Sequence, residues 1–553
     1  MKYIIVGGVA GGASTAARLR RLDEHAEIIL FEKGAHVSYA NCGLPYYIGD
    51  VITDRNKLFV QTPANFKQRF NIDTRVLNEV LSIDSTNKIV SVKNHTTGNT
   101  YQESYDKLVL SPGAEPLRPP LQGIDLEGIF TLRNVPDTDK IKAYVSNVQN
   151  GRAVIIGAGF IGLEMAENLH HLGMQVTVIE MGDQILAPTD MTIAAFAQQH
   201  IRSKGVDIRL KTAVTGFEKT ASGLNVLLKD GKPIEADIVI LSIGVRPDTR
   251  LAVSAELQLG NAKGILVNEF LQTSNLDIYA VGDAIEFINP ITGNSMPTYL
   301  AGPANKQGRI CANNIAVGNK SRYNGSINTA IVKLFDLTVA VAGVASKHLK
   351  AANIEHFTSI THSGSHAGYY PDSEQMSIQL NFNAEGKLLG AQVIGKEGVD
   401  KRIDTLSSVI QRGSTIHELT EFEHAYAPPY SSAKDPVNMA GFVAENILNG
   451  ILKVVPWNHT YTLGKDDVLI DVRTETEFSN GHIPGAINVD IDYLRERMHE
   501  IPKDKNIYIY CQIGLRGYMA QRILLQHHYQ NVKNISGGYK LWEVCNKEKQ
   551  ITN

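Results

Sequence analysis

Two stretches of the chain repeat one order of apolar and polar positions. Residues 2–22 read as an apolar strand, a glycine turn and a helix, and residues 27–32 form a second apolar run that ends at Glu32. Residues 152–173 and 175–180 repeat this order, and the second copy ends at Glu180. A short strand that enters a glycine turn before a helix is typical of a βαβ unit with a parallel sheet. The pattern therefore predicts an α/β protein with an internal repeat.

The pattern changes after about residue 323. Residues 329–344 and 376–395 alternate as antiparallel strands do, and residues 400–413 have the period of a helix. Gly450 and Pro456 mark a connector. After it, strand and helix patterns alternate again, which predicts a separate small α/β domain.

The two glycine turns are typical of dinucleotide sites. Backbone N–H groups and the helix N-terminus meet a pyrophosphate there, and an acidic residue about 20 positions later binds a ribose hydroxyl. In the first turn Val9 replaces the middle glycine, so this turn alone is weak evidence. The second turn matches GxGxxG in full, with Gly157, Gly159 and Gly162.

Composition excludes some function classes. A chain of 553 residues is too long for one core and predicts about three to five domains. A net charge of −3 gives no basic excess that would favour nucleic acid or an anionic membrane. No apolar run approaches the roughly 18 residues of a membrane helix, and the start of the chain reads as a strand rather than a secretory signal. We expect a soluble, cytoplasmic protein.

Four cysteines are spread along the chain without CxxC spacing: Cys42, Cys311, Cys511 and Cys545. This spacing favours neither a zinc site nor a disulfide framework, so we expect no metal and a reducing compartment. We expect Cys311 to be a small buried hydrophobic residue and Cys545 to be incidental.

Several motifs together resemble a known superfamily. They are "GGVAGGAS", "SYANCGLPY", "GAGFIGLE", "IYAVGD", "GKEGVDKRID" and "AYAPPYSSAKDPVNMAG". Residues 1 to about 445 resemble the pyridine nucleotide-disulfide oxidoreductases, specifically the coenzyme A disulfide reductase branch, and residues from about 460 resemble a rhodanese domain. The implied fold has two Rossmann-like dinucleotide-binding domains, an α+β dimerisation domain and a C-terminal α/β rhodanese domain.

The patterns and the resemblance together predict domain boundaries. They are 1–110 for the first part of an FAD-binding domain, 111–150 for its continuation and crossover, 151–275 for an NAD(P)H-binding domain, 276–325 for the second FAD part, 326–445 for the dimerisation domain, 446–459 for a linker and 460–553 for the rhodanese domain.

By this resemblance the first unit binds FAD and the second binds NADH, with NADPH possible. Glu180 would accept hydrogen bonds from the adenosine ribose and repel a 2′-phosphate, which favours NADH. Asp283 would hold the flavin ribityl chain. The cofactor-binding candidates are Gly7, Gly8, Ala10, Gly11, Gly12, Glu32, Lys33, Ser111, Gly113, Gly157, Gly159, Gly162, Glu180, Gly282 and Asp283.

One cysteine, Cys42, stands where glutathione-type reductases of this superfamily carry two. A single cysteine must store its oxidised form as a mixed disulfide, a sulfenate or a persulfide. NADH oxidases, NADH peroxidases and coenzyme A disulfide reductases do so. Peroxidases and water-forming oxidases typically place a histidine in the first turn, where this chain has Val9 and Ala10, which argues against peroxide.

Ser14, Arg18 and Arg21 share one helical face by their spacing. Arginines on such a face are usually solvated, but by resemblance this face contacts coenzyme A, whose phosphates need cations. One further contact position of the family falls on Phe70, so its basic neighbours Lys67 and Arg69 are alternatives. The candidates for coenzyme A are Ser14, Arg18, Arg21, Ser38, Asn41, Lys67, Arg69, Phe70, Asn305 and Lys434.

Two tyrosines, Tyr369 and Tyr426, reach the site from the partner subunit of a homodimer in the family. A tyrosine there could donate a proton to a departing thiolate. The alternatives are that both are structural residues of a dimer interface, or that Tyr370 takes the place of Tyr369.

The loop "YCQIGLRG" places Arg516 five residues after Cys511. Such a loop directs backbone N–H groups at the sulfur and stabilises a thiolate or persulfide. Asp471, Arg473 and His482 complete the rhodanese resemblance as scaffold.

These expectations combine into an FAD-dependent NAD(P)H reductase of persulfides, polysulfides and coenzyme A disulfide or persulfide. Electrons would pass from the nicotinamide through FAD to Cys42, and Cys511 would carry sulfane sulfur. One alternative is an NADH oxidase or peroxidase that uses a Cys42 sulfenate, and another is a rhodanese sulfurtransferase with a regulatory flavin domain. The predicted catalytic residues are Cys42, Cys511, Tyr369, Tyr426 and Arg516.

Overall fold

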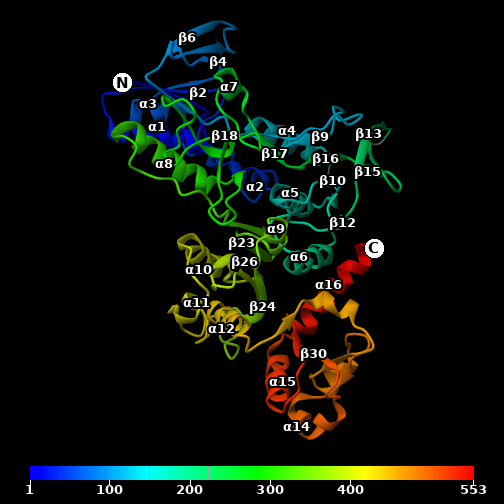
Figure 1. Cartoon of the computed structure of the whole chain (residues 1–553). Coiled ribbons are helices and arrows are strands. Elements are labelled where there is room, and N and C mark those ends of the chain that lie inside the picture. The colour runs from blue at the N-terminus through cyan, green and yellow to red at the C-terminus, as the bar shows by residue number, and fades with distance from the viewer. Residues whose placement is uncertain (149, 222, 553) are drawn as a thin grey trace. The chain divides into compact units, whose positions relative to one another are not determined.

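The computed structural model describes residues 1–148, 150–221 and 223–552. By their internal contacts the residues divide into two compact units (Figure 1). The first unit comprises Met1–Met181 and Thr212–Asn328, and the second comprises Gly182–Lys211 and Thr329–Asn553. Residues 182–211, which the sequence places inside the predicted NAD(P)H-binding domain, thus group with the second unit.

The first unit contains a parallel sheet in the order β19-β7-β1-β2-β3. Its strands are β1 (Lys2–Val6), β2 (Glu27–Glu32), β3 (Asp73–Val76), β7 (Lys107–Leu110) and β19 (Ile278–Ala280). Helix α1 (Ala10–Leu22) follows β1 and packs along α8 (Ala301–Val317). The inner strands are apolar on both faces, as expected for a covered parallel sheet.

A second parallel sheet in the same unit repeats this layout, with strand order β11-β10-β16-β9. It consists of β9 (Ile129–Thr131), β10 (Arg152–Ile156), β11 (Gln175–Ile179) and β16 (Ile238–Leu241), with α5 (Phe160–His171) after β10. The predicted internal repeat is therefore present as two separate sheets.

Shorter elements complete the first unit. The helices are η1 (Asn41–Gly43), α2 (Leu44–Ile48), η2 (Arg55–Leu58), α3 (Pro63–Phe70), α4 (Val135–Ser146), α7 (Arg250–Ser254) and η3 (Gly282–Ala284). The remaining strands are β4 (Asn78–Asp84), β5 (Ile89–Asn94), β6 (Thr100–Ser104), β8 (Ala114–Pro116), β13 (Val214–Thr220), β14 (Gly223–Leu228), β15 (Ile234–Ala236), β17 (Val245–Pro247), β18 (Ile265–Leu266), β20 (Ile285–Ile288) and β21 (Ser295–Pro297).

The second unit contains an antiparallel sheet in the order β22-β23-β26-β25-β24. The strands are β22 (Ala330–Leu334), β23 (Leu337–Gly343), β24 (Phe357–Gly364), β25 (Gln375–Phe382) and β26 (Leu388–Gly395). Packed against it are α6 (Met191–Ser203), α10 (Val399–Arg412) and α12 (Pro436–Leu448); β12 (Asp207–Arg209), α9 (Ser346–Ala351) and α11 (His417–Glu421) complete this part. The sheet-and-helix prediction for this region is confirmed.

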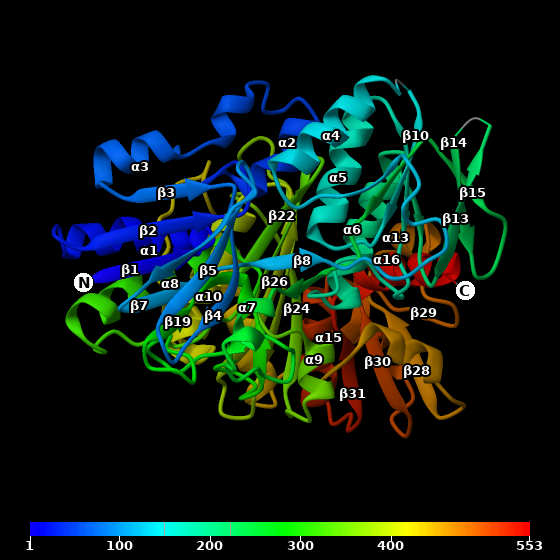
Figure 2. The same ribbon diagram turned by 90° about the horizontal axis from the view of Figure 1, so that it is seen from above.

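The last part of the second unit is a parallel sheet in the order β27-β31-β30-β28-β29. Figure 2 shows β28, β30 and β31 running side by side next to α15. Strand β27 lies inside the predicted 446–459 connector, so the connector itself supplies an edge strand. The elements are β27 (Val454–Val455), η4 (Trp457–Thr462), β28 (Asp467–Asp471), α13 (Glu475–Ser479), β29 (Ile487–Asn488), η5 (Ile491–Tyr493), α14 (Leu494–Arg497), η6 (Met498–Glu500), β30 (Asn506–Tyr510), α15 (Leu515–Gln526), β31 (Val532–Ile535) and α16 (Gly538–Thr552).

None of the helices within the described residues is both long and apolar enough to cross a membrane.

Candidate functional site

The first glycine turn lies where β1 passes into α1. Gly7 has φ +99°, and a Cβ there would lie 2.0 Å from Ser111 O. A Cβ at Gly12 would lie 1.9 Å from Gly7 O. Only glycine fits either position, so this turn brings bare backbone N–H groups to the start of α1. Glu32 closes the turn by accepting from Gly8 N at 2.9 Å.

Most of the predicted FAD-binding residues line one cavity of about 220 Å³ beside this turn. Burial raises the pKa of the Asp283 carboxyl there, and the Arg133 guanidinium lowers it. The predicted FAD-binding residues at the cavity are Gly7, Gly8, Ala10, Gly11, Glu32, Lys33, Ser111, Gly113, Gly282 and Asp283. Asn41, predicted as a coenzyme A contact, also lines it. The glycines leave room for a pyrophosphate, Glu32 can accept from a ribose hydroxyl, and Asp283 adds a polar group to the cavity wall. These features fit a flavin dinucleotide.

Arg133 is a residue that the sequence reasoning missed. It lines the same cavity, and its Nη2 lies 2.4 Å from the place that a Cβ of Gly113 would take. Gly113 has φ +77°, so glycine both permits the turn and makes room for the guanidinium. A lone arginine after a short strand carries no motif, so only the structure identifies it.

The second glycine turn has the same geometry between β10 and α5. Gly157 has φ +101°, and a Cβ at Gly162 would lie 2.1 Å from Gly157 O. Gly159 faces open space, with no atom within 4 Å of its Cβ position among the described residues. Glu180 accepts from Ala158 N at 2.9 Å, as Glu32 does in the first turn. The arrangement fits a nicotinamide dinucleotide.

Cys42 lies in η1, directly before α2, and its side chain is exposed. Partial burial raises the pKa of the Cys42 thiol, and the carboxylates of Glu164 and Asp283 raise it further. Burial also raises the pKa of Glu164 to about 7, and Tyr46 donates to it at 3.3 Å. The surrounding side chains therefore favour the thiol over the thiolate.

Ser38 and Asn41 lie on the segment that leads to Cys42. Ser38 has φ +48°, and its N–H donates to Gly8 O at 2.7 Å, which ties the segment to the first glycine turn. Asn41 Oδ1 is buried and has no hydrogen-bond partner among the described residues. An orphaned acceptor at a cavity wall fits a bound ligand.

The predicted coenzyme A face of α1 meets α8. Ser14 Oγ donates to Asn305 Oδ1 at 2.5 Å, and Arg18 Nε donates to Asn313 Oδ1 at 3.0 Å. Desolvation and the neighbouring guanidiniums of Arg309 and Arg21 lower the pKa of Arg18.

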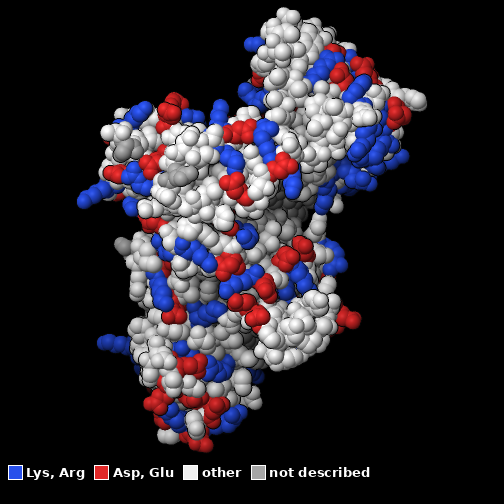
Figure 3. Space-filling model, turned by 180° about the vertical axis from the view of Figure 1, so that it is seen from behind, with Lys and Arg blue, Asp and Glu red and all other residues white. Residues whose placement is uncertain are grey.

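Lysine and arginine side chains gather over α1, α3 and α8 in Figure 3. Arg309 is a second residue that the sequence reasoning missed, because it lies on α8, far from the arginines of α1 in the sequence. Mutually repelling cations fit an anionic ligand.

The three alternatives on α3 differ in burial. Phe70 packs against the core and lies near Phe66, with ring centroids 6.0 Å apart and the ring planes tilted by 48°. Lys67 and Arg69 are exposed, and Lys67 Nζ donates to Asn71 Oδ1 at 3.0 Å. The two basic side chains are therefore the accessible ones.

Tyr369, Tyr426 and Lys434 belong to the second unit. The hydroxyls of Tyr369 and Tyr426 lie 2.8 Å apart, and both rings are exposed. This hydrogen bond raises the pKa of Tyr369. Lys434 is exposed. Tyr370 is also exposed, and its ring lies against His366 instead.

Cys511 begins the loop between β30 and α15. Its side chain is 1% exposed, and Gly514 N donates to its Sγ at 3.1 Å. Arg516 pairs with Glu477 through two contacts of 2.6 and 2.7 Å. A buried sulfur with a backbone donor and a nearby cation can hold a persulfide anion. Cys511 thus lies beside Gly514 N and Arg516, but Glu477 neutralises the cation.

The other two cysteines are buried. Cys311 on α8 is 0% exposed, and burial raises the pKa of its thiol strongly. Cys545 is also 0% exposed and packs with Ala195, Ile360 and Leu541. Cys545 therefore packs as a small buried hydrophobic residue, and its being incidental to the chemistry stays a prediction.

Three family matches cover most of the chain. Residues 1–307 match the pyridine nucleotide-disulphide oxidoreductase family. Residues 329–436 match the dimerisation domain of that family, and residues 461–545 match the rhodanese-like domain.

Individual relatives agree. A coenzyme A disulfide reductase of Staphylococcus epidermidis is 38% identical over 445 residues, which are 80% of this chain and all of that protein. The crystal structure of reduced Bacillus anthracis CoADR-RHD is 48% identical, with a TM-score of 0.97 over 99% of this chain and 98% of that one. A NAD-dependent persulfide reductase from A. fulgidus is 38% identical, with a TM-score of 0.92 over 98% of this chain and all of that one. The chain therefore belongs to the pyridine nucleotide-disulphide oxidoreductases and is a flavin enzyme of that family with its own rhodanese-like domain.

Proposed function

We propose that this enzyme uses NADH to reduce persulfides, polysulfides and coenzyme A disulfide or persulfide. The observation that carries the proposal is the presence, in one chain, of a single exposed Cys42 near the dinucleotide cavity and a built sulfur loop around Cys511. If coenzyme A disulfide were the sole substrate, the sulfur loop would have no part in the reaction.

Cys42 is the proposed nucleophile. Its sulfur attacks the carbon-bound sulfur of a persulfide, forms a mixed disulfide with the substrate thiol and releases sulfide. FAD, when bound in the first glycine turn, supplies the electron pair from NADH that cleaves this disulfide. The overall reaction converts a persulfide, NADH and a proton into a thiol, hydrogen sulfide and NAD⁺.

Coenzyme A is the proposed thiol partner of Cys42. Arg18 and Arg21, with Arg309 beside them, offer cations to its phosphates, and Ser14 on the same helix adds a neutral hydroxyl. Ser38 and Asn41 lie on the same segment as Cys42, where the pantetheine thiol would arrive. The family's dimerisation domain favours a homodimer, in which Tyr369 and Tyr426 of one subunit donate a proton to the thiolate that leaves Cys42 of the other.

Cys511 is the proposed sulfur carrier. Its persulfide would be stabilised by Gly514 N and by the helix that begins at Leu515. Transfer of the outer sulfur to coenzyme A leaves the Cys511 thiol free for the next donor.

The test is mass analysis of the native protein with and without reductant. We expect an adduct with the mass of coenzyme A on Cys42, lost on reduction. A sulfenate on Cys42 under the same conditions would overturn the proposal and favour an oxidase or peroxidase.

A further inference from the structure

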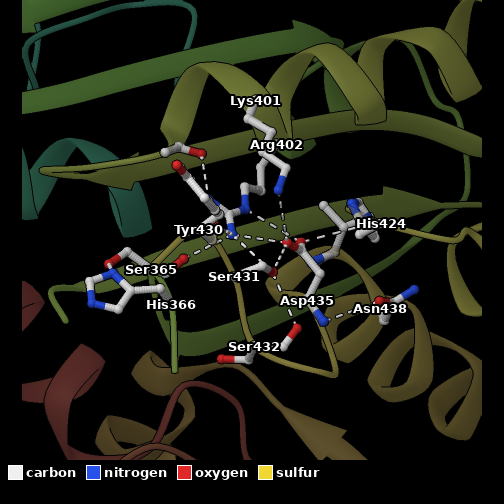
Figure 4. Close-up of polar contacts among 12 residues, drawn as sticks. Ser365, His366, Lys401, Arg402, His424, Tyr430, Ser431, Ser432, Asp435 and Asn438 are labelled. Atoms are coloured by element: carbon white, nitrogen blue, oxygen red, sulfur yellow. Dashed lines mark hydrogen bonds and ion pairs between the residues drawn. The ribbon is translucent and has the colours of Figure 1, made fainter. Parts of the chain in front are cut away.

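Arg402 and Asp435 form a buried ion pair at the centre of the polar cluster in Figure 4. Arg402 Nη2 donates to Asp435 Oδ2 at 2.9 Å, and the two side chains are 2% and 0% exposed. Although burial raises the pKa of Asp435, hydrogen bonds from Arg402 and Ser431 outweigh burial and hold that pKa below its ordinary value. A buried ion pair often adds little to the free energy of unfolding, so stability alone does not explain why this pair is here.

The Arg402 side of the pair holds the segment 365–370, which carries Tyr369. Arg402 Nη2 also donates to Ser365 O at 2.9 Å. His366, next along this segment, is fixed by a contact of 2.9 Å with Pro371 O. The guanidinium therefore sets where this segment leaves the sheet.

The Asp435 side holds the segment 424–435, which carries Tyr426. Asp435 accepts from Ser431 Oγ at 2.6 Å and caps α12 by accepting from Val437 N at 2.9 Å. The two segments also meet directly, because Ala367 N donates to Ser431 O at 3.0 Å. The Asp435 carboxylate thus connects the end of the segment 424–435 to the first turn of α12.

Two further side chains lie near the Asp435 carboxylate, but neither is within hydrogen-bond distance of it. His424 Nε2 lies 3.8 Å from Asp435 Oδ1, and burial lowers the pKa of this histidine. Lys401 Nζ lies 4.0 Å from Asp435 Oδ2. Arg402 is therefore the charged group in hydrogen-bond contact with the carboxylate.

Apolar packing does not hold the two tyrosines. Tyr369 is 76% exposed and Tyr426 is 47% exposed. A cavity of about 510 Å³, lined in part by Arg402 and Tyr430, borders Tyr426. The 2.8 Å contact between the tyrosine hydroxyls therefore depends on how the polar cluster fixes the two segments.

We propose that Arg402 and Asp435 are positioning residues for the sulfur reaction, which hold Tyr369 and Tyr426 so that their hydroxyls meet. The inference rests on the proposed function, in which these tyrosines protonate the departing thiolate. The ion pair transfers no proton and acts only through the tyrosines. Small misplacement of reacting groups is costly, since an error of about 1 Å can lower a rate about 10²-fold.

The first test variant is Asp435→Asn. Asparagine caps helices as well as aspartate does, so α12 keeps its cap while Arg402 loses its counter-charge. Ser431→Ala is a milder variant that removes one donor to Asp435 and leaves the ion pair. The matched control is Arg412→Lys, which changes an arginine of the same helix α10 whose pair with Glu418 is exposed.

The kinetic measurement is reoxidation of the NADH-reduced enzyme by a persulfide. We expect Asp435→Asn to slow reoxidation about tenfold, because a misplaced general acid still supplies part of the ~10²–10⁴-fold that a well-placed one contributes. The rate at which NADH reduces the enzyme should be the same in the variant as in the wild type. The loss should be larger for an alkyl disulfide than for an aryl disulfide, whose leaving thiol needs less protonation. Equal losses for both disulfides would overturn the inference.

A combination of variants separates this inference from the proposed function. In the Tyr369→Phe/Tyr426→Phe background, adding Asp435→Asn should cause no further loss, because Asp435 acts through the tyrosines. A further tenfold loss would overturn the positioning role and leave the tyrosine role intact. Wild-type reoxidation by the double phenylalanine variant would instead overturn the tyrosine role, and this inference with it.

A readout without turnover is the ¹⁹F resonance of a fluorotyrosine placed at position 426. It should shift in Asp435→Asn and in Ser431→Ala and stay unchanged in Arg412→Lys. An unchanged resonance in both cluster variants overturns the inference. If Asp435→Asn does not fold, Ser431→Ala takes its place in each of these comparisons.

Discussion

The Arg516 guanidinium forms a two-contact ion pair with Glu477, at 2.6 and 2.7 Å, beside the Cys511 loop. Arg516 holds the pKa of Glu477 at about 2, well below its ordinary value of 4.5. Glu477 also closes the N-terminus of α13 in a capping box with Thr474. One carboxylate therefore joins a helix start to the sulfur loop.

Glu477→Gln should lower the free energy of unfolding at pH 7 by about 0.5–1 kcal/mol, since both side chains are about a third exposed and solvent screens the pair. Glutamine keeps the capping box. Because the folded pKa is depressed, this stability is present above pH 4.5 and is lost as the pH falls towards 2. Denaturant titrations of both proteins across this range measure it. A difference that persists unchanged at pH 2 would contradict the ion-pair explanation.

Cys511→Ser should lower turnover of persulfide and polysulfide about tenfold and spare coenzyme A disulfide, because only the sulfane sulfur has to be carried as a persulfide. Steady-state rates with each substrate test this. Cys545→Ser, another cysteine of the second unit, is the control and should leave the substrate ratio unchanged. Equal losses for all substrates in Cys511→Ser would exclude the carrier role.

Arg18→Gln should raise KM for coenzyme A disulfide about tenfold, which corresponds to about 1.4 kcal/mol of binding free energy. The rate of reduction by NADH should not change. Raising the salt concentration should weaken binding to the wild type more than to the variant, because salt screens exposed charges. Arg322→Gln, at an exposed pair with Glu269, is the matched control. A KM that does not respond to Arg18→Gln would mean that α1 does not bind the substrate.

Glu180→Ala should raise KM for NADH about tenfold and narrow the preference over NADPH, since the carboxylate repels a 2′-phosphate. Initial rates with both nucleotides measure the ratio. Met181→Leu, at the next and exposed position, should leave the ratio unchanged. A wild-type enzyme that prefers NADPH would refute this role of Glu180.

The sequence by itself determined the local features. The glycines of the two turns predicted the nucleotide sites. No other residue fits at Gly12 or Gly162, because a Cβ there would lie about 2 Å from a backbone oxygen. The strand patterns predicted the two parallel sheets of the first unit, the antiparallel sheet of the second unit and the α/β order of the C-terminal part. The spacing of Ser14 and Arg18 predicted that both side chains lie on one face of a helix.

Only the tertiary structure decided which distant residues complete each local site. Arg309 joins Arg18 across two packed helices, Glu477 neutralises Arg516, and the pair of Arg402 and Asp435 supports two tyrosine segments. The contacts of residues 182–211 and of Cys545 were equally hidden. The reason is physical: periodicity and turn chemistry act over a few residues, whereas charge pairing and burial depend on which elements meet after the chain has folded.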